Sequence, residues 1–224
     1  FCSLRRTSEK TRLDIEKNSE TKEEYQYDTK LRTMQPIKVT NHSSTGDYYA
    51  TEYKYPFHLS ANVYRQMTAN KMVDPVIETR KYKGTTLLET SINSYTQTGS
   101  IFAITGIHTG KGNTPEARAT LTYDSKGNIA SYIKDEAEKT VYLWSYSGMY
   151  PVAEIRNATY SEVQTAATSI GLNLNTLLSS TAPDMPQVNL LRDKLRQAFI
   201  TTWTYRPLVG ITSQTTPDEK TTHY

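Results

Sequence analysis

One segment, Leu121 to Ile129, constrains the fold more than any other part of the chain, because it spells out a β-hairpin turn. Asp124 can accept a hydrogen bond from the backbone two residues further on, and Gly127 can adopt a positive φ without a Cβ clash. The apolar Ile129 then restarts the strand. We therefore predict that the chain reverses between Tyr123 and Ile129 as an antiparallel hairpin.

Tyrosine dominates the aromatic residues, with 17 Tyr against 4 Phe in 224 residues. A tyrosine ring can pack on a half-buried sheet while its hydroxyl stays in water, so this choice favours β structure. The charges, 26 basic and 23 acidic, give a net charge of +3 and are spread along the chain. Neither a nucleic-acid partner nor an anionic lipid surface is indicated by this distribution.

Period-two alternation of apolar and polar residues recurs along most of the chain and predicts an antiparallel meander. Tyr49, Thr51, Tyr53 and Tyr55 are a clear example, closed by Pro56. Further strands are predicted at residues 76–82, 86–95, 100–107, 118–123, 129–134, 140–146, 151–155, 200–205 and 210–215.

Helical signals interrupt this pattern in two places. Ser60 can cap a helix over residues 61–72, and Thr159 with Glu162 forms a capping box before a helix that Gly171 ends. Asn173 can cap a short turn of helix. Asp184 can cap a longer helix, whose predicted apolar stripe is Val188, Leu191, Leu195 and Phe199.

The spelling Tyr-Asp-x-x-Gly-Asn-Ile from Tyr123 to Ile129 resembles the YD repeat of the Rhs/YD-repeat family, large bacterial surface and secreted proteins that include toxin-carrying members. Other segments between Tyr25 and Tyr224 add to the likeness, and their order along the chain fits. They are residues 25–28, 51–57, 76–79, 142–146, 150–153 and 204–213.

The resemblance implies a fold and a role. In that family the repeats resemble a continuous β-strand spiral that can enclose a cargo, and this chain looks like the part leading into the repeat array. The implied division is a polar segment 1–24, a β-meander with one short helix 25–158, a helical insertion 159–199 and the start of a further YD-like unit 200–224. The self-cleavage and toxin parts of the family are absent from the sequence, so their activities are not carried over.

Motifs for catalysis or cofactor binding are weak. The loop-like run from Gly106 to Gly112 approaches a phosphate-binding loop, but its glycine spacing is one residue short and it lacks the magnesium-binding hydroxyl, so a hairpin loop is favoured. The four histidines have no metal-ligand spacing and favour turn or surface roles. Asp135, Glu136 and Glu138 are predicted to form a solvated turn rather than a glycosidase pair.

Cys2 stands alone at the start of the chain, and we expect no disulfide, metal or cofactor.

The rings of Tyr142, Trp144 and Tyr146 alternate along one strand, so we predict that they lie on one face. Either they pack against the helices between Thr159 and Phe199, or they form a stacking platform for a ligand. In the second case Trp144, Tyr146 and Trp203 are the candidate ligand-stacking residues.

The sequence thus predicts a mainly β protein, an antiparallel meander of YD-repeat-like hairpins with short helical insertions. The expected role is a non-catalytic scaffold segment of a secreted or cell-surface protein, whose partner is the remainder of its parent repeat protein. No signal segment is present in the chain, and no apolar run is long enough to span a bilayer. The alternative is a surface adhesin or carbohydrate-binding module with a glycan or cell-surface ligand, and a hydrolase ranks third.

Overall fold

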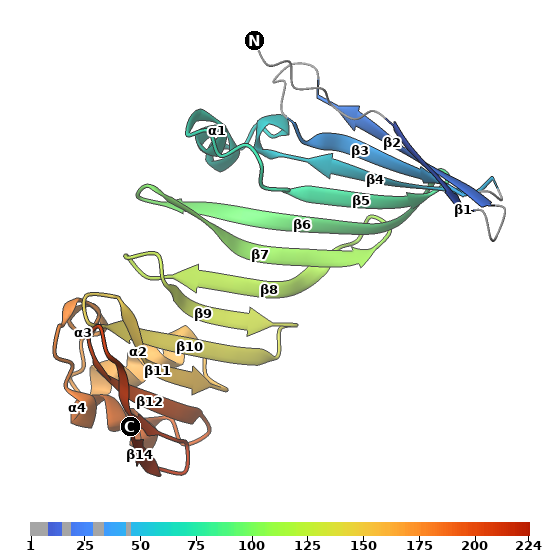
Figure 1. Ribbon diagram of the computed structural model, residues 1–224. Coiled ribbons are helices and arrows are strands. Elements are labelled where there is room, and N and C mark those ends of the chain that lie inside the picture. The colour runs from blue at the N-terminus through green and yellow to red at the C-terminus, as the bar shows by residue number, and fades with distance from the viewer. Residues whose placement is uncertain (1–8, 15–18, 29–33, 44–45) are drawn as a thin grey trace. The chain divides into compact units, whose positions relative to one another are not determined.

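The computed structural model describes residues 9–14, 19–28, 34–43 and 46–224. The chain forms two compact units, Phe1–Arg118 and Ala119–Tyr224. In each unit the strands are antiparallel and follow one another in sequence order, which confirms the predicted meander (Figure 1). The fold is mainly β, with a few short helices. None of the helices in the described residues is long and apolar enough to cross a membrane.

The first unit is a sheet of long hairpins, and most side chains of β3, β4, β6 and β7 are half-buried. Strand β8 (Glu116–Tyr123) begins in this unit and ends in the second. The other strands are β1 (Glu9–Asp14), β2 (Ser19–Tyr27), β3 (Pro36–His42), β4 (Tyr48–Lys54), β5 (Glu78–Lys83), β6 (Thr86–Thr98) and β7 (Ile101–Lys111).

Between β4 and β5 the chain forms a 3-10 turn, η1 (Pro56–His58), and a helix, α1 (Asn62–Ala69), which packs against η1 and β6. Met67 on α1 is fully buried. The predicted cap at Ser60 is wrong, because Ala61 occupies the N-cap position and no side chain caps the helix. The helix also ends at Ala69, three residues before the predicted end, since Lys71 adopts a φ of 64°.

The glycine-rich run after Phe102 does not form the predicted hairpin loop. Gly106 to Lys111 continue strand β7, and the turn begins only at Gly112, whose φ is +57°. A Cβ at Gly110 would lie 2.3 Å from the carbonyl oxygen of Thr114. The glycine is therefore required by the close approach of the backbone that connects β7 to β8, and it does not form part of an anion-binding loop.

The second unit places a group of helices on one face of its sheet. Its remaining strands are β9 (Ile129–Lys134), β10 (Glu138–Ser145), β11 (Tyr150–Arg156), β12 (Phe199–Arg206), β13 (Gly210–Thr215) and β14 (Thr221–His223). Its helices are α2 (Tyr160–Ser169), α3 (Leu174–Ser179), α4 (Met185–Asn189) and α5 (Leu191–Lys194).

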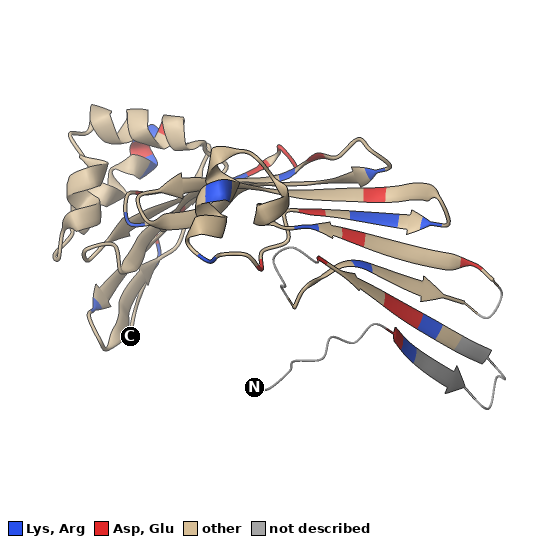
Figure 2. Ribbon diagram, turned by 90° about the horizontal axis from the view of Figure 1, so that it is seen from above, with Lys and Arg blue, Asp and Glu red and all other residues tan. Residues whose placement is uncertain are grey.

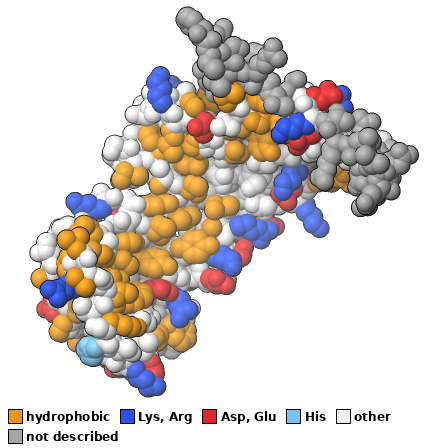
Figure 3. Space-filling view, in the orientation of Figure 1, with side chains coloured by type: hydrophobic (Ala, Val, Ile, Leu, Met, Phe, Trp, Pro, Cys, Tyr) orange, Lys and Arg blue, Asp and Glu red, His pale blue; other side chains and the backbone are white. Residues whose placement is uncertain are grey.

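Alternation along β10 decides which side chains enter the core. Val141 and Leu143 are buried in one cluster with residues of α2, α3, α4 and α5, such as Val163 and Val188. On β11 the register shifts opposite Leu143, so that two consecutive residues, Val152 and Ala153, are both fully buried. Hydrophobic side chains also gather over the strands of this unit on the face seen in Figure 3.

The capping residues of this unit behave as predicted, but one helix does not. Thr159 and Glu162 form the capping box of α2, and the side chains of Asn173 and Asp184 cap α3 and α4. The single helix predicted from Asp184 to Phe199 is wrong. It is two short helices, α4 and α5, joined at Leu190, and Phe199 is the first residue of β12 with 55% of its surface exposed.

The hairpin between β8 and β9 forms as predicted. One carboxylate oxygen of Asp124 accepts hydrogen bonds from the backbone N–H groups of Lys126, at 2.8 Å, and Asn128, at 3.0 Å. Gly127 has a φ of +87°. The turn is thus held by one aspartate and one glycine.

Candidate functional site

Charged side chains of the first unit pair across neighbouring strands. Lys38 on β3 lies opposite Glu52 on β4, with Nζ 3.0 Å from Oε1, and Lys81 on β5 lies opposite Glu89 on β6 at 2.9 Å. Blue and red positions on neighbouring strands mark several of these charges in Figure 2. Opposite charges placed directly across a ladder stabilise strand pairing and its register.

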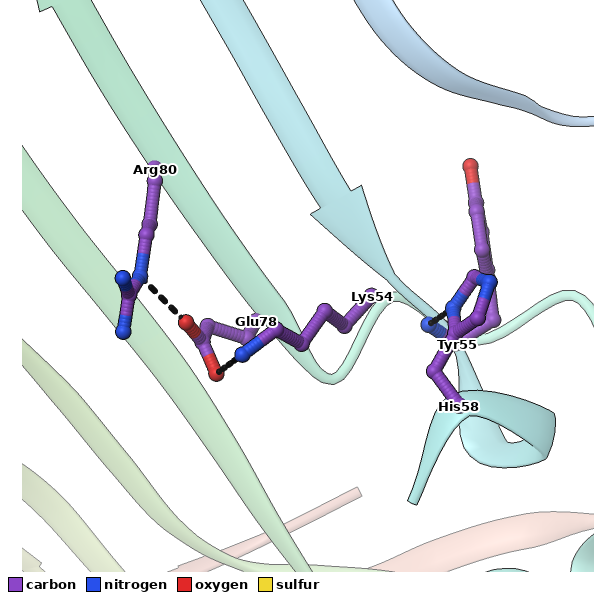
Figure 4. Close-up of polar contacts among 5 residues, drawn as sticks. All are labelled: Lys54, Tyr55, His58, Glu78 and Arg80. Atoms are coloured by element: carbon purple, nitrogen blue, oxygen red, sulfur yellow. Dashed lines mark hydrogen bonds and ion pairs between the residues drawn. The ribbon is translucent and has the colours of Figure 1, made fainter. Parts of the chain in front are cut away.

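Glu78, at the start of β5, is the most enclosed of these carboxylates, with 12% of its side chain exposed. One oxygen lies 2.9 Å from Lys54 Nζ and the other accepts a hydrogen bond from Arg80 Nε (Figure 4). Burial alone would raise the pKa of this carboxyl, but Lys54 and Arg80 outweigh it and hold the pKa below its usual value of 4.5. Glu78 is therefore an ionised, fully engaged acceptor and is poorly suited to act as a general base.

His58 closes the neighbouring turn. Its Nδ1 accepts a hydrogen bond from the backbone N–H of Tyr55 at 3.0 Å (Figure 4). Its Nε2 lies 3.7 Å from Asp28 Oδ2. The acceptor role of Nδ1 places the proton of the neutral ring on Nε2. Burial lowers the pKa of His58, partly offset by Asp28, so the neutral ring is favoured. Both ring nitrogens therefore have partners, one beside the turn and one just after β2.

Tyr55, the residue that precedes this turn, is held by burial and by a hydrogen bond. The residue is 3% exposed, and its hydroxyl donates to the carbonyl oxygen of Pro36 at 2.8 Å. Burial raises the pKa of this phenol to about 12. It is a structural hydrogen-bond donor at every pH at which the protein would be studied.

A cavity of about 420 Å³ opens above these groups, lined by Lys38, Glu52, Lys54, Glu78 and Arg80 with apolar contributions from Ile37, Tyr53 and Leu59. Its charged side chains pair with one another instead of pointing freely into the space. These ion pairs join β3 to β4 and β4 to β5. Sequence reasoning did not single out these residues, although the Lys and Glu at alternate positions of successive strands carry the signal.

The other polar candidates do not converge. Among the residues that the structure describes, no group of His, Cys, Asp and Glu could hold a metal ion. Asp135, Glu136 and Glu138 lie exposed around the β9–β10 turn, as predicted, with Asp135 and Glu136 at positive φ. His108 lies within β7, whereas a turn or surface role was expected. Cys2 lies outside the described residues.

The predicted aromatic row along β10 is corrected by the structure. The strand ends at Ser145, and Tyr146 adopts a φ of 53° that breaks the alternation. Tyr142 and Trp144 alternate with the buried Val141 and Leu143, so their rings point away from the helix-covered core. The prediction that all three rings share one face is therefore wrong: of the three, Tyr146 belongs to the buried core cluster that the helices cover.

Tyr146 belongs to the same buried core cluster as Val141 and Leu143. It is 8% exposed, and its ring packs edge-on against Tyr150 and Tyr205, with centroids 5.6 Å and 5.9 Å away. Its hydroxyl lies 3.2 Å from both the carbonyl oxygen and the N–H of Tyr205. The residue joins the β10–β11 turn to β12 and leaves little ring surface for a ligand.

Trp144 and Trp203 are partly exposed. Trp144 donates its indole N–H to the carbonyl oxygen of Ile129 at 2.8 Å, which fixes the ring across β9. Trp203 lies between the buried Thr202 and the half-buried Thr204 on β12, opposite Gln214. By alternation both indoles lie on the face away from the helices, and a stacking role for them stays a prediction.

Comparison with known proteins gives the following. No family model matches the chain. No curated protein matches it. Among solved structures, it is similar to TcdB2-TccC3 without its hypervariable C-terminal region, with 13% identity over 92% of this chain and a TM-score of 0.38. It is also similar to a Photorhabdus luminescens Tc holotoxin pore carrying a TccC3 mutation, with 12% identity over 91% of this chain and a TM-score of 0.36. The chain spans 11% of the length of each of these chains.

Proposed function

We propose that this chain is a non-catalytic structural segment of an exported Rhs/YD-repeat-like protein, in which it contributes β-hairpins to a repeat shell. The observation that carries the proposal is the order of the strands: in each unit every strand pairs with its neighbours in sequence, one hairpin after another. A sheet built in this way can be extended one hairpin at a time, as repeat architectures are.

Two further features support a scaffold. The Tyr-Asp-x-x-Gly-Asn-Ile segment that resembles the family's repeat forms a hairpin turn held by Asp124. In addition, the charged side chains around Glu78 form ion pairs with one another across neighbouring strands. These pairs stabilise the sheet and leave no free acid or base in that cavity.

The test is made in the parent protein. Electron cryo-microscopy of the full-length protein should find both units within the wall of a shell, with β14 pairing to a strand outside this chain. If the units instead form a separate domain detached from any such wall, the scaffold proposal is wrong.

A second candidate, a carbohydrate-binding surface, is favoured by one observation: Trp144 and Trp203 are partly exposed on the face of the second unit that no helix covers. Neutral oligosaccharides titrated into the purified chain should then shift tryptophan emission, and Trp203→Ala should abolish the shift. Emission that no saccharide changes would reject these indoles as a binding surface.

A further inference from the structure

A second cavity, of about 510 Å³, lies beside α2 in the second unit, and its two walls differ in chemistry. One wall is a row of hydroxyls, Ser161, Thr165 and Ser169, spaced four residues apart on one face of α2. The opposite wall is the end of α5 and the segment that follows it, which contribute Lys194 and Arg196.

The hydroxyl wall presents acceptors to the cavity. Thr165 donates its hydroxyl proton to the carbonyl oxygen of Ser161 at 2.9 Å, and Ser169 donates to that of Ala166 at 2.7 Å. Because their protons are used within the helix, the lone pairs of these hydroxyl oxygens remain for donors on a ligand. The wall suits a molecule rich in hydroxyl groups.

The opposite wall presents positive charge. Lys194 and Arg196 are exposed, and neither forms an ion pair with any residue in the part of the chain that the structure describes. The only carboxylate in the lining, Glu162, is turned to its own helix cap, where it accepts hydrogen bonds from the N–H and the hydroxyl of Thr159, both at 2.7 Å. The cavity near Glu78 pairs its charges internally, whereas this cavity keeps two cations facing solvent.

An adjoining cavity continues the surface with an aromatic ring. The two cavities share Asn157, whose side-chain N–H donates to the carbonyl oxygen of Gln197 at 2.8 Å and so ties the shared wall to the start of α2. The adjoining space is lined by Phe199, which is 55% exposed, by the cations Lys139 and Arg156, and by one carboxylate, Glu138. Arg156 Nε lies 3.5 Å from Glu154 Oε1, so Lys139 is the cation of this space that forms no ion pair with another described residue.

We propose that these joined cavities bind an acidic saccharide, an oligosaccharide that contains uronic acid residues. Its carboxylates would pair with Arg196 and Lys194, its hydroxyls would donate to the row on α2, and the C–H face of one sugar ring would stack on Phe199. A phosphate ion or an acidic peptide would pair with the cations but would make no contact that uses the hydroxyl row on α2 or the ring of Phe199. The site is separate from the shell role and does not depend on it.

The test is isothermal titration of the purified chain with tetragalacturonate, alongside a neutral galactose tetrasaccharide and a tetraglutamate peptide. The acidic saccharide should bind, and each of Arg196→Gln and Lys194→Gln should weaken it by about tenfold, the loss of one charge-assisted hydrogen bond. Phe199→Leu should also weaken it. Arg206→Gln, which removes an exposed cation elsewhere in the same unit, is the matched control and should bind as the unmodified chain does.

Several results would overturn the proposal. They are absence of binding by the acidic saccharide, equal binding of the neutral saccharide, equal binding of tetraglutamate, or equal weakening by Arg206→Gln. The altered residues are all exposed, so unchanged thermal unfolding of each variant will show that lost binding is not lost folding. Any of these results leaves the shell test above unaffected.

Discussion

At the residue scale, backbone conformation limits the side chains that a turn accepts. Gly127 has a φ of +87°, a region that β-branched residues rarely adopt. We expect Gly127→Val to lower the free energy of unfolding by about 1 kcal/mol or more. Urea unfolding followed by tryptophan fluorescence measures this, because Trp144 and Trp203 both belong to the same unit as the turn. Lys126→Val, one position earlier and exposed, should change the midpoint little, and equal effects of the two substitutions would contradict the turn's role.

The stability that one carboxylate contributes depends on how buried it is and on which cations surround it. Glu78→Gln leaves Lys54 and Arg80 without their shared anion, so we expect a loss of roughly 1–3 kcal/mol of stability near neutral pH. Glu116→Gln is the matched control, because Glu116 pairs with Arg118 but keeps 75% of its side chain exposed. Its loss should be within about 0.5 kcal/mol. Urea midpoints of the two variants give the comparison.

The same residue predicts a pH dependence whose sign follows from its pKa. Since the pKa of Glu78 in the folded protein lies below its usual value of 4.5, the unfolded chain binds the proton more tightly. The stabilisation by Glu78 is therefore complete above pH 4.5 and is lost as the pH falls through the lower, folded-state value. The stability difference between the unmodified chain and Glu78→Gln should shrink in that acidic range, and a difference that stays constant would contradict the ion pairing.

At the element scale, the sequence predicts what local chemistry determines. The hairpin at Asp124, the capping box at Thr159 and the cap at Asp184 all follow from hydrogen bonds within a few residues, and all three form. The aromatic row failed at Tyr146, because its positive φ and its contacts with Tyr205 depend on residues far away in sequence.

The break between α4 and α5 has the same origin. An apolar stripe at helical spacing predicts one helix from Asp184, but Arg192 instead donates hydrogen bonds to the carbonyl oxygens of Ile200, at 2.7 Å, and Thr216, at 3.1 Å. These tertiary bonds hold α5 to the strands that follow it. The ion pairs around Glu78 were missed for a similar reason, since only strand register brings Lys54 opposite Glu78.

Two adjacent leucines test how α5 docks. Leu191 is fully buried in the core cluster, whereas its neighbour Leu190 is 47% exposed. Leu191→Asp would bury a carboxylate without a partner and should cost several kcal/mol, while Leu190→Asp should cost less than about 1 kcal/mol. Thermal unfolding by circular dichroism compares them. Similar melting temperatures would mean that the α4–α5 segment does not pack on the sheet.

At the scale of the whole molecule, the strand order leaves β14 pairing with β13 alone among the described residues. Residues 221–223 of this strand are Thr, Thr and His, and all are exposed. The strand at the other end of the strand order, β1, instead carries the charged residues Glu9, Lys10, Arg12 and Asp14 in its sequence. Charge, above all lysine, on an edge strand discourages pairing with another chain, so β14 is the less protected edge.

This difference predicts how the chain behaves at high concentration. We expect the unmodified chain to associate as its concentration rises, through pairing at the open edge of β14, and Thr222→Lys to suppress that association by placing a lysine there. Because Thr222 is exposed, the substitution should change the free energy of unfolding by no more than about 0.5 kcal/mol. Thr120→Lys is the matched control, since Thr120 is also exposed but lies on β8, where it already pairs with Ile133 of β9. Static light scattering across a concentration series separates the two variants: suppression by Thr222→Lys alone identifies the open edge, whereas equal suppression by both would assign the association to net charge.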